Sequence, residues 1–272
     1  MDKPSFKKLE KISSTLRQHV IDMLLEAGSG HTAGSLGTAD IFAALHFSIM
    51  GSKDKFILSN GHICPVLYAT LVEKKLIPKK DLWTLSKIGS NLQGHPQYGS
   101  LPGIEVTSGS LGQGLSQAIG MSLAAKMNGD KYRVYCMTGD GELNEGQVWE
   151  AAMFAGNRKL NNLTWIIDRN NIQIDGHTEE IMPLENLRHK LESFNWLVIE
   201  IDGHNLEEII NSFNMAKAVT QRPTAIIAYT IPGKGVGFIE YKVEWHGKTP
   251  NKKQALEALH DIRTMKGKIK YD

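Results

Sequence analysis

The chain has 272 residues, of which 41% are hydrophobic and 22% charged, a composition typical of a globular protein with a substantial core. Its 31 basic and 29 acidic residues give a net charge of +2, and no long basic block indicates a nucleic-acid or membrane partner. Two cysteines, Cys64 and Cys136, form neither a disulfide framework nor a metal cluster. The N-terminal segment has no apolar signal core, and no run approaches the roughly 18 apolar residues of a membrane span. We therefore expect a cytoplasmic protein.

The first part of the chain predicts helices joined by long loops. Apolar residues at helical spacing predict a helix from about Phe6 to Ala27, which ends at the glycines of "GSGH". A second helix is expected over residues 38–50, and "KFILSNGH" predicts a short buried strand that opens into a turn and another helix. Residues 82–114 hold few periodic runs and many turn-forming residues, so we expect loops that cross a surface.

The rest of the chain alternates strands and helices. The pattern predicts, in order, helix 111–127, strand 132–138, helix 145–158, strand 163–168, strand 196–202, helix 205–220, strand 224–230 and a last helix over 252–266. Such alternation indicates an α/β fold, with a parallel β-sheet covered by helices on both faces. No internal repeat or low-complexity linker divides the sequence, so we expect a single domain over residues 1–272.

Two polar loops follow neighbouring strands of this predicted sheet. "GDGELNEG" comes after strand 132–138, and "RNNIQIDG" comes after strand 163–168. Ligands bind beyond the carboxyl ends of parallel strands, and a right-handed crossover returns both loops to one edge of the sheet. We therefore expect Asp140 and Asn170 to lie close together.

The residues of these loops suit a cation and a phosphate. A carboxylate, an amide oxygen and main-chain carbonyls are the hard oxygen ligands that hold Mg²⁺ or Ca²⁺ together with ligand phosphates. Gly139 and Gly141 allow the backbone to come close to a ligand, and the N-terminus of helix 145–158 favours an anion. Asp140 and Glu142 could instead be ordinary acids at a helix start. The second loop, at the expected position, favours the binding site.

Histidines provide a second indication. Six of the ten stand directly beside a glycine: His31, His62, His95, His177, His204 and His246. An imidazole on a flexible loop suits proton transfer, or hydrogen bonding to a polyol or phosphate near neutral pH, although any one of them is more often a surface or capping residue. The other four fall within helical patterns and are expected to be structural: His19, His46, His189 and His260.

In their order along the chain, these motifs resemble those of transketolase. The stretch "GDGELNEGQVWEAAMFAGNRKLNNLTWIIDRNNIQIDG" is similar to the thiamine-diphosphate motif, a GDG followed by an Asn-containing turn. "SGHTAGSLG", "FILSNGH", "GHPQ", "VTSGSLGQGLSQAIGMSLAAK" and "EWHG" resemble further segments from the N-terminal part of that family. GDG alone is a weak signal, whereas the ordered set is specific and covers nearly the whole chain.

The resemblance implies a cofactor, thiamine diphosphate, bridged to the protein by Mg²⁺, for which Ca²⁺ or Mn²⁺ can substitute. The implied metal ligands are Asp140, Asn170 and the main-chain carbonyl of Ile172. The implied cofactor contacts are His62, Gly109, Ser110, Leu111, Gly141, Asn170, Ile174 and His246. The histidines implied to line the substrate channel and move protons on hydroxyl groups are His31, His95 and His246. Glu145 matches an acid that lies near the contact with a neighbouring chain in the family.

One departure from the family pattern concerns the loop of the first histidine. The family usually has Gly-His-Pro-Gly there, whereas this chain has "GHTAGS". Proline fixes the backbone φ angle, so Thr32 and Ala33 leave the shape of this loop open. They do not affect the presence of the His31 imidazole.

A larger departure is the extent of the chain. In the family the cofactor lies between two kinds of domain, and the domain that binds the aminopyrimidine supplies a carboxylate to its ring. This sequence ends at Asp272, after the first kind only. We therefore expect the N-terminal, diphosphate-binding subunit of a split transketolase. It would act with a separate C-terminal subunit, in a two-plus-two heterotetramer, and transfer a two-carbon ketol unit from a ketose phosphate to an aldose phosphate.

Other functions are consistent with the same residues. The chemistry could act on a sulfonated or branched-chain sugar, since the groups that read the substrate's terminal anion are expected in the other subunit. A 2-oxo acid dehydrogenase lacks this set of channel histidines, and a deoxyxylulose phosphate synthase carries both domains in one chain, so both fit less well. A non-catalytic subunit that retains half a cofactor site is a hypothesis of a different class.

Overall fold

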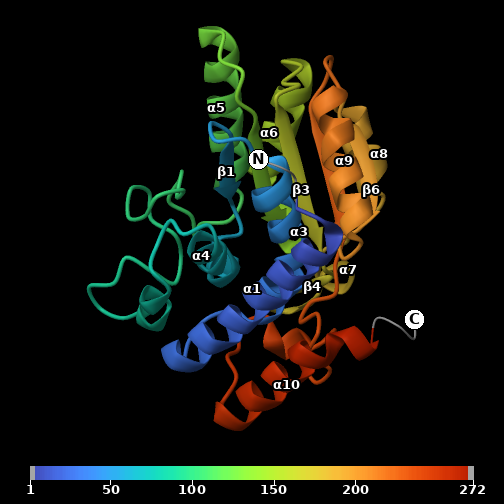
Figure 1. The fold of residues 1–272 in the computed structure, drawn as a ribbon. Coiled ribbons are helices and arrows are strands. Elements are labelled where there is room, and N and C mark those ends of the chain that lie inside the picture. The colour runs from blue at the N-terminus through green and yellow to red at the C-terminus, as the bar shows by residue number, and fades with distance from the viewer. Residues whose placement is uncertain (1–3, 269–272) are drawn as a thin grey trace.

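The central feature of the fold is a five-stranded parallel sheet with the strand order β1-β2-β3-β7-β6, seen in a computed structural model that describes residues 4–268 (Figure 1). The strands are β1 Lys55–Leu58, β2 Val134–Gly139, β3 Leu163–Arg169, β6 Leu197–Asp202 and β7 Thr224–Tyr229. A small antiparallel pair, β4 Ile172–Gln173 and β5 Gly176–His177, follows β3. The parallel α/β fold predicted from the sequence is confirmed.

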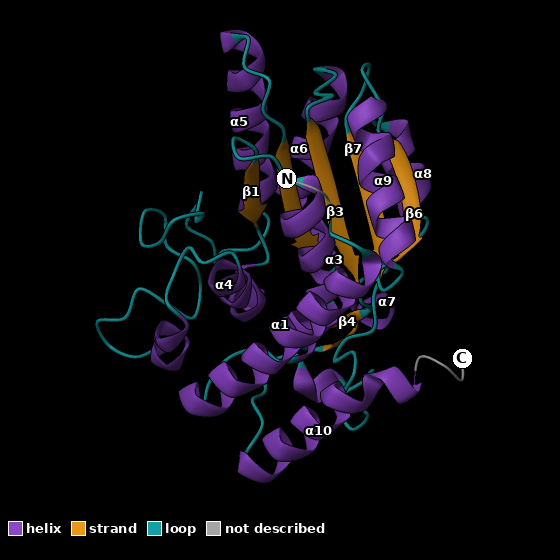
Figure 2. Ribbon diagram, in the orientation of Figure 1, coloured by secondary structure: helices purple, strands orange, loops and turns teal. Residues whose placement is uncertain are grey.

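Helices cover both faces of the sheet (Figure 2). The helices that share one core are α1 Phe6–Ala27, α3 Ala39–Ala44, α4 Cys64–Glu73, α9 Leu206–Ala218 and α10 Lys252–Lys268. Those of the other core are α5 Gln113–Asn128, α6 Gly146–Asn157 and α8 Leu187–Ser193. Two short helices, α2 Ala33–Gly37 and α7 Thr178–Ile181, lie in the connections.

Alternating side chains of the strands create these two cores. Tyr135 and Met137 of β2 lie in the core shared with α1, α3 and α9, whereas Val134 and Cys136 lie in the core shared with α5, α6 and α8. Successive residues of a strand point to opposite faces of a sheet. A strand covered on both faces is therefore apolar at every position, which explains the unbroken apolar run before the GDG motif.

The register of the sheet brings the two predicted loops together. β2 and β3 pair in parallel with Gly139 opposite Asp168. The main-chain N–H of Asp140 donates to the carbonyl of Asp168 at 3.1 Å, and a side-chain oxygen of Asp140 accepts from the N–H of Asn171 at 2.7 Å. The expected proximity of the loops that carry Asp140 and Asn170 is therefore confirmed.

The helix predicted over residues 38–50 is present over residues 39–49, but its last part is not α-helical. Regular α-helix ends at Ala44, and residues 45–49 form a wider π-turn. The wider turn carries His46, whose ring lies 5.4 Å from that of Phe42 and 4.8 Å from that of Phe56, centroid to centroid. Helices α7 and α8 and the β4–β5 pair were not predicted, because elements of two to seven residues are too short to show a hydrophobic period.

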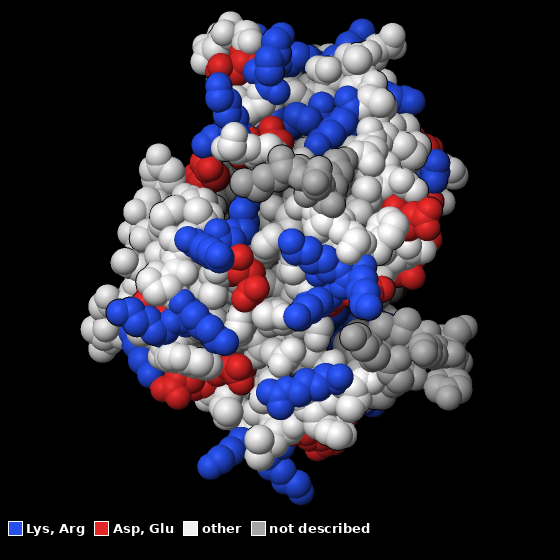
Figure 3. Space-filling model, in the orientation of Figure 1, with Lys and Arg blue, Asp and Glu red and all other residues white. Residues whose placement is uncertain are grey.

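Charged side chains are mixed over the molecular face drawn in Figure 3, where acids lie among the lysines and arginines. Cys64 begins α4 and Cys136 lies within β2, and both are buried free thiols. Across residues 4–268, none of the helices combines the length and the apolar character needed to cross a bilayer.

Candidate active site

A cavity of about 240 Å³ opens at the carboxyl ends of β1, β2 and β3. It is lined by most of the residues singled out from the sequence: His31, His62, His95, Gly109, Leu111, Asp140, Gly141, Asn170, Ile172, Ile174 and His246. Ser110 is exposed and does not belong to this lining. Segments spread over more than two hundred positions of the chain thus meet at one place, as the strand-end rule for α/β sheets predicts.

Asp140 begins the loop after β2 and is only 1% exposed. Its Oδ1 accepts a hydrogen bond from the N–H of Gly141 at 2.8 Å. Its Oδ2 accepts from the N–H of Asn171 at 2.7 Å and from Nη1 of Arg169 at 2.9 Å. Burial raises the pKa of Asp140, and these donors oppose the rise. A carboxylate has about four lone-pair sites, so the fixed side chain can still bind a cation.

Arg169 is a residue of this site that was not predicted. It is 3% exposed, and besides Asp140 its guanidinium contacts Glu179 and Glu185, the latter at 3.1 Å. One buried cation therefore faces three carboxylates, and the local charge stays negative. A negative surplus of this kind favours the binding of a further cation.

Asn170 is oriented by a neighbouring buried acid. Its Nδ2 donates to Oδ2 of Asp168 at 2.8 Å, and its Oδ1 accepts from the N–H of Ile172 at 3.0 Å. Burial raises the pKa of Asp168 to about 7, against the hydrogen bonds from Thr230 and Asn170 that lower it. Asn170 and Ile172 line the same cavity as Asp140. The three residues therefore offer a carboxylate, an amide oxygen and a main-chain carbonyl from adjoining positions.

Glu142 forms hydrogen bonds to three separate segments that surround the cavity, a role that the sequence did not predict. It is 2% exposed. Its Oε1 accepts from the hydroxyl of Ser59 and from the N–H of Gly112, the latter at 2.7 Å, and its Oε2 accepts from the N–H of Gly139 at 3.1 Å. Burial raises the pKa of Glu142 to about 6, and these hydrogen bonds oppose the rise. The carboxylate thus fixes the loop before α5 against the ends of β1 and β2.

Four of the six glycine-flanked histidines converge on the cavity. The ring centroid of His31 lies 5.0 Å from that of His62, 6.4 Å from that of His95 and 5.9 Å from that of His246. Burial lowers the pKa of all four, to about 4 for His246 and well below the usual value for His62. The rings are therefore neutral at pH 7, and each can donate from one nitrogen and accept at the other.

The other two glycine-flanked histidines do not reach the cavity. Nδ1 of His204 lies 2.9 Å from Oδ2 of Asp40, and its Nε2 accepts from the N–H of Ile231 at 2.8 Å. Asp40 also pairs with the buried Arg17, so His204 completes a structural network between α1, α3 and the loop after β7. His177 ends β5 and is exposed.

Polar atoms without partners indicate what the cavity binds. Within residues 4–268, the buried side-chain atoms that lack a hydrogen-bond partner include both amide atoms of Asn60, Nε2 of Gln173 and Nδ1 of His246, all at this cavity. Buried polar atoms are normally hydrogen-bonded. At Gly141 an added Cβ would lie 2.9 Å from Cβ of Gln173, so glycine is needed for the two loops to approach this closely beside the cavity. The site therefore fits a polar, phosphate-bearing ligand.

A cation at this site would depend on the ligand as well as on the protein. Among the described residues, no group of three or more histidines, cysteines or acids could hold a metal ion. The candidate set contains one carboxylate, that of Asp140, with the oxygens of Asn170 and Ile172. Mg²⁺ usually binds through one or two carboxylates together with substrate phosphates and water. The donor set thus fits Mg²⁺ shared with a diphosphate.

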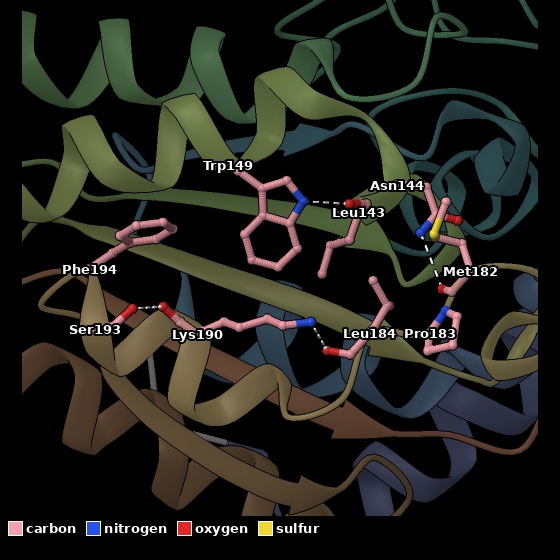
Figure 4. Close-up of a pocket in the computed structure, with 9 residues that line it drawn as sticks. All are labelled: Leu143, Asn144, Trp149, Met182, Pro183, Leu184, Lys190, Ser193 and Phe194. Atoms are coloured by element: carbon pink, nitrogen blue, oxygen red, sulfur yellow. Dashed lines mark hydrogen bonds between the residues drawn. The ribbon is translucent and has the colours of Figure 1, made fainter.

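A second cavity, of about 440 Å³, lies between α6, α8 and the segment 182–184 (Figure 4). Trp149 and Phe194 contribute aromatic surface, and Nζ of Lys190 donates to the carbonyl of Leu184 at 2.8 Å. Of the described residues that line it, Lys190 is the one with a titratable side chain. It therefore offers surface but no acid–base pair, and the chemistry is concentrated at the smaller cavity.

Comparison with known proteins agrees with this geometry. The family model "Transketolase, thiamine diphosphate binding domain" matches residues 9–270. The chain belongs to the transketolase family. Its relatives include one of the subunits of the apulose-4-phosphate transketolase of Phocaeicola vulgatus, 40% identical over 93% of both chains. Another is the 6-deoxy-6-sulfo-D-fructose transketolase subunit SqwG of a Clostridium species, 42% identical over 88% of this chain and 90% of its own.

Solved transketolase structures share the fold. The transketolase of Campylobacter jejuni superposes with a TM-score of 0.90 at 32% identity, over 96% of this chain and 43% of that chain. The two subunit relatives match this chain over nearly their full lengths. The Campylobacter enzyme is longer, and this chain covers 43% of it. The family predicted from the ordered motifs is confirmed.

Proposed function

We propose that this chain is the diphosphate- and metal-binding subunit of a two-chain transketolase, which transfers a two-carbon ketol unit from a ketose to an aldose. The convergence of Asp140, Asn170 and four neutral histidines on one cavity supports this function most strongly. Two relatives of matching length are named as transketolase subunits, which supports a separate partner subunit.

In this proposal Asp140, Asn170 and the carbonyl of Ile172 hold Mg²⁺, which Ca²⁺ or Mn²⁺ can replace. Gly141 leaves room for the diphosphate of thiamine diphosphate. Three further sets of contacts would complete the binding of the cofactor. The imidazoles of His62 and His246 would donate to the diphosphate, Ile174 would pack against the thiazolium ring, and Gly109, Ser110 and Leu111 would lie along the aminopyrimidine. The partnerless polar atoms at the cavity and the exposed rim position of Ile174 are consistent with these roles.

Thiamine diphosphate, when bound, supplies the carbon nucleophile and the electron sink. The residues of this chain orient the sugar and move protons. A neutral imidazole can accept a proton from a sugar hydroxyl and return it, and burial keeps His31, His95 and His246 neutral near pH 7. The 5.9 Å spacing of the His31 and His246 rings allows both to reach hydroxyls of one substrate.

The partner subunit would complete the cleft. We propose that residues 1–272 form a single domain, that the pyrimidine-binding and C-terminal domains belong to the partner, and that two chains of each kind form a heterotetramer. Large apolar side chains are exposed at the cavity rim and on α6: Ile174 is 64% exposed, Met153 56% and Phe154 39%. Glu145 precedes α6 and is exposed, and we propose that it also contacts the partner.

The substrate would be a sugar phosphate, with a sulfonated or branched-chain sugar as the second candidate. The names of the two relatives are consistent with both candidates, because one specifies apulose-4-phosphate, a sugar phosphate, and the other 6-deoxy-6-sulfo-D-fructose, a sulfonated sugar. A terminal phosphate or sulfonate is an anion in either case. Its recognition would need basic side chains, and none lines the described cavity besides the neutral histidines.

Reconstitution tests the proposal. This chain is combined with the product of a neighbouring gene that encodes the second half, and ketol transfer is measured with a pentulose phosphate, a branched-chain ketose phosphate and 6-deoxy-6-sulfofructose as donors. We expect transfer that requires both chains, thiamine diphosphate and Mg²⁺. Full activity from this chain alone would contradict the two-chain enzyme.

The variant Asp140→Ala distinguishes the proposed catalytic subunit from a non-catalytic subunit. Loss of the one carboxylate ligand should weaken Mg²⁺-dependent cofactor binding in the assembled enzyme by more than about a hundredfold. Asp130→Ala, at an exposed turn, is the matched control and should leave binding unchanged. A non-catalytic subunit predicts instead that both variants support full activity.

A further inference from the structure

Thr32, the residue at which the first histidine loop departs from the family pattern, is fully buried. Its hydroxyl donates to the main-chain carbonyl of Lys248 at 2.5 Å, across 216 positions of sequence. The proline that the family usually has here offers no hydroxyl donor. This chain therefore contains a link between two distant segments that the usual sequence does not provide.

Both ends of this hydrogen bond adjoin histidines of the cavity. Thr32 directly follows His31, and Lys248 comes two positions after His246. The rings of these two histidines lie 5.9 Å apart and are nearly perpendicular, at 87°. The link thus joins the two segments at the point where they present their imidazoles.

The segment that carries His246 is also anchored through Trp245, and the N–H of His246 donates to the carbonyl of Val243 at 2.9 Å. Trp245 is 3% exposed, and its ring lies 5.4 Å from that of Phe238, centroid to centroid. Beyond His246 the chain returns to the surface, where Gly247 and Lys248 are exposed. His246 is therefore held by an apolar anchor on one side and by the bond from Thr32 on the other.

Little room is left for this segment to move without disturbing the site. A Cβ added at Gly247 would lie 2.9 Å from Cδ1 of Ile174 and 3.9 Å from Cδ2 of His31. The backbone at Gly247 thus lies close to the residues proposed to touch the thiazolium ring and the sugar. A small displacement here would change the shape of the substrate channel.

The His31 loop has additional anchors of its own. The hydroxyl of Ser35 donates to the carbonyl of His31 at 2.9 Å, and the N–H of Gly233 donates to the carbonyl of Ala33 at 2.8 Å. These bonds do not involve the Thr32 hydroxyl. Loss of that hydroxyl should therefore leave His31 in place and loosen the segment after Trp245, which carries His246.

We propose that Thr32 is a positioning residue, whose hydroxyl fixes His246 relative to His31 and so sets the spacing of the imidazoles that contact sugar hydroxyls. A misplacement of reacting groups by about 1 Å can cost on the order of a hundredfold in rate, so one hydrogen bond at this place can matter for turnover. Because this role presupposes the proposed function, its structural and kinetic parts need separate measurements.

The structural part is tested on the full chain without substrate. Thr32→Val keeps the shape of the side chain and removes the hydroxyl, whereas Thr32→Ser keeps the hydroxyl. We expect Thr32→Val to speed amide hydrogen exchange in the segment 243–250 by about tenfold, with no change in α1 or β2, and Thr32→Ser to behave as the wild type. Equal exchange in the Val variant and the wild type would overturn the proposal, whatever the enzyme's activity.

The kinetic part uses the assembled enzyme. Thr32→Val should lower kcat/KM for the donor ketose by about tenfold, with the half-saturating Mg²⁺ concentration unchanged within about twofold, and Thr32→Ser should restore the wild-type kcat/KM. An unchanged kcat/KM for the donor, or an equal loss for Mg²⁺ and donor, would show that Thr32 does not position the histidine. Absence of ketol transfer by the wild-type pair would overturn the proposed function, and the exchange experiment would still decide whether the link exists.

Discussion

Two buried aspartates, each beside a buried arginine, occupy different electrostatic situations in this molecule. Asp40 accepts from both Nη atoms of Arg17 and lies 2.9 Å from Nδ1 of His204. Although burial opposes it, these partners hold the pKa of Asp40 well below its usual range. Asp140 accepts one bond from Arg169, yet burial raises its pKa.

The pKa values of the two aspartates differ because the two arginines form ion pairs with different numbers of acids. Within residues 4–268 the acid that pairs with Arg17 is Asp40, and the pair is completed by a histidine. Arg169 is shared among Asp140, Glu179 and Glu185. A carboxylate balanced within the chain stabilises the fold, whereas one left in a negative surplus at a cavity is available to an external cation.

The largest expected effect concerns the ion pair between Asp40 and Arg17. Asp40→Asn removes one charge and leaves Arg17 buried without a counter-ion, which should lower the free energy of unfolding by about 3–5 kcal/mol. Urea denaturation of the full chain measures this, with Asp130→Asn at an exposed turn as the control. A loss below about 1 kcal/mol would mean that the network has no structural role.

At the cavity, Glu142→Gln should impair binding more than folding. The amide can replace only one acceptor oxygen, so its NH₂ group would face an N–H donor of Gly112 or Gly139. We expect a loss of about 2–3 kcal/mol, seen as a roughly 30- to 150-fold weaker affinity for thiamine diphosphate in the assembled enzyme. Glu257→Gln, on the exposed side of α10, should bind as the wild type does.

Two histidine variants, one from each region, should have opposite effects on activity and stability. His246→Asn should reduce kcat/KM by about 10- to 100-fold and change stability little. His204→Asn should cost about 1–2 kcal/mol of stability, because Asp40 and the N–H of Ile231 lose their partner, and keep kcat/KM within about twofold. Equal loss of activity in both variants would remove the distinction between the two regions.

The smallest expected effect is a dependence of stability on pH. Burial lowers the pKa of His46 to about 3 in the folded chain, against about 6.5 when unfolded. Between these values the unfolded chain binds more protons, so this contribution is complete above pH 6.5 and declines as the pH falls. We expect a loss of about 1.4 kcal/mol per pH unit below 6.5. Denaturation at pH 7.5 and 5.5 measures it, and His46→Phe should reduce the slope.

Local patterns in the sequence predict the long elements and the first part of the site. The apolar period of α1 and the alternation of β2, α6 and β3 are visible within short windows. The rule that neighbouring parallel strands end at one edge was sufficient to place Asp140 beside Asn170. The ordered motifs then indicated the family and most of the cavity lining.

Partners from distant segments could not be predicted in this way. Glu142 meets a serine 83 positions away and a glycine 30 positions away, and Asp40 meets a histidine 164 positions away. Such pairs depend on how the layers pack, which leaves no local period. Thr32 stood out as a departure from the family, but its partner, 216 positions along, could be found only in the fold.

The order of the strands has a consequence for synthesis on the ribosome. β6 precedes β7 in the chain, yet its sheet neighbour is β7, which lies between β6 and β3. Until residues 224–229 have emerged, the newly made β6 has no strand beside which to pair. At about 5–20 residues per second, β6 remains unpaired for seconds in the nascent chain. A chaperone would act most effectively in that interval.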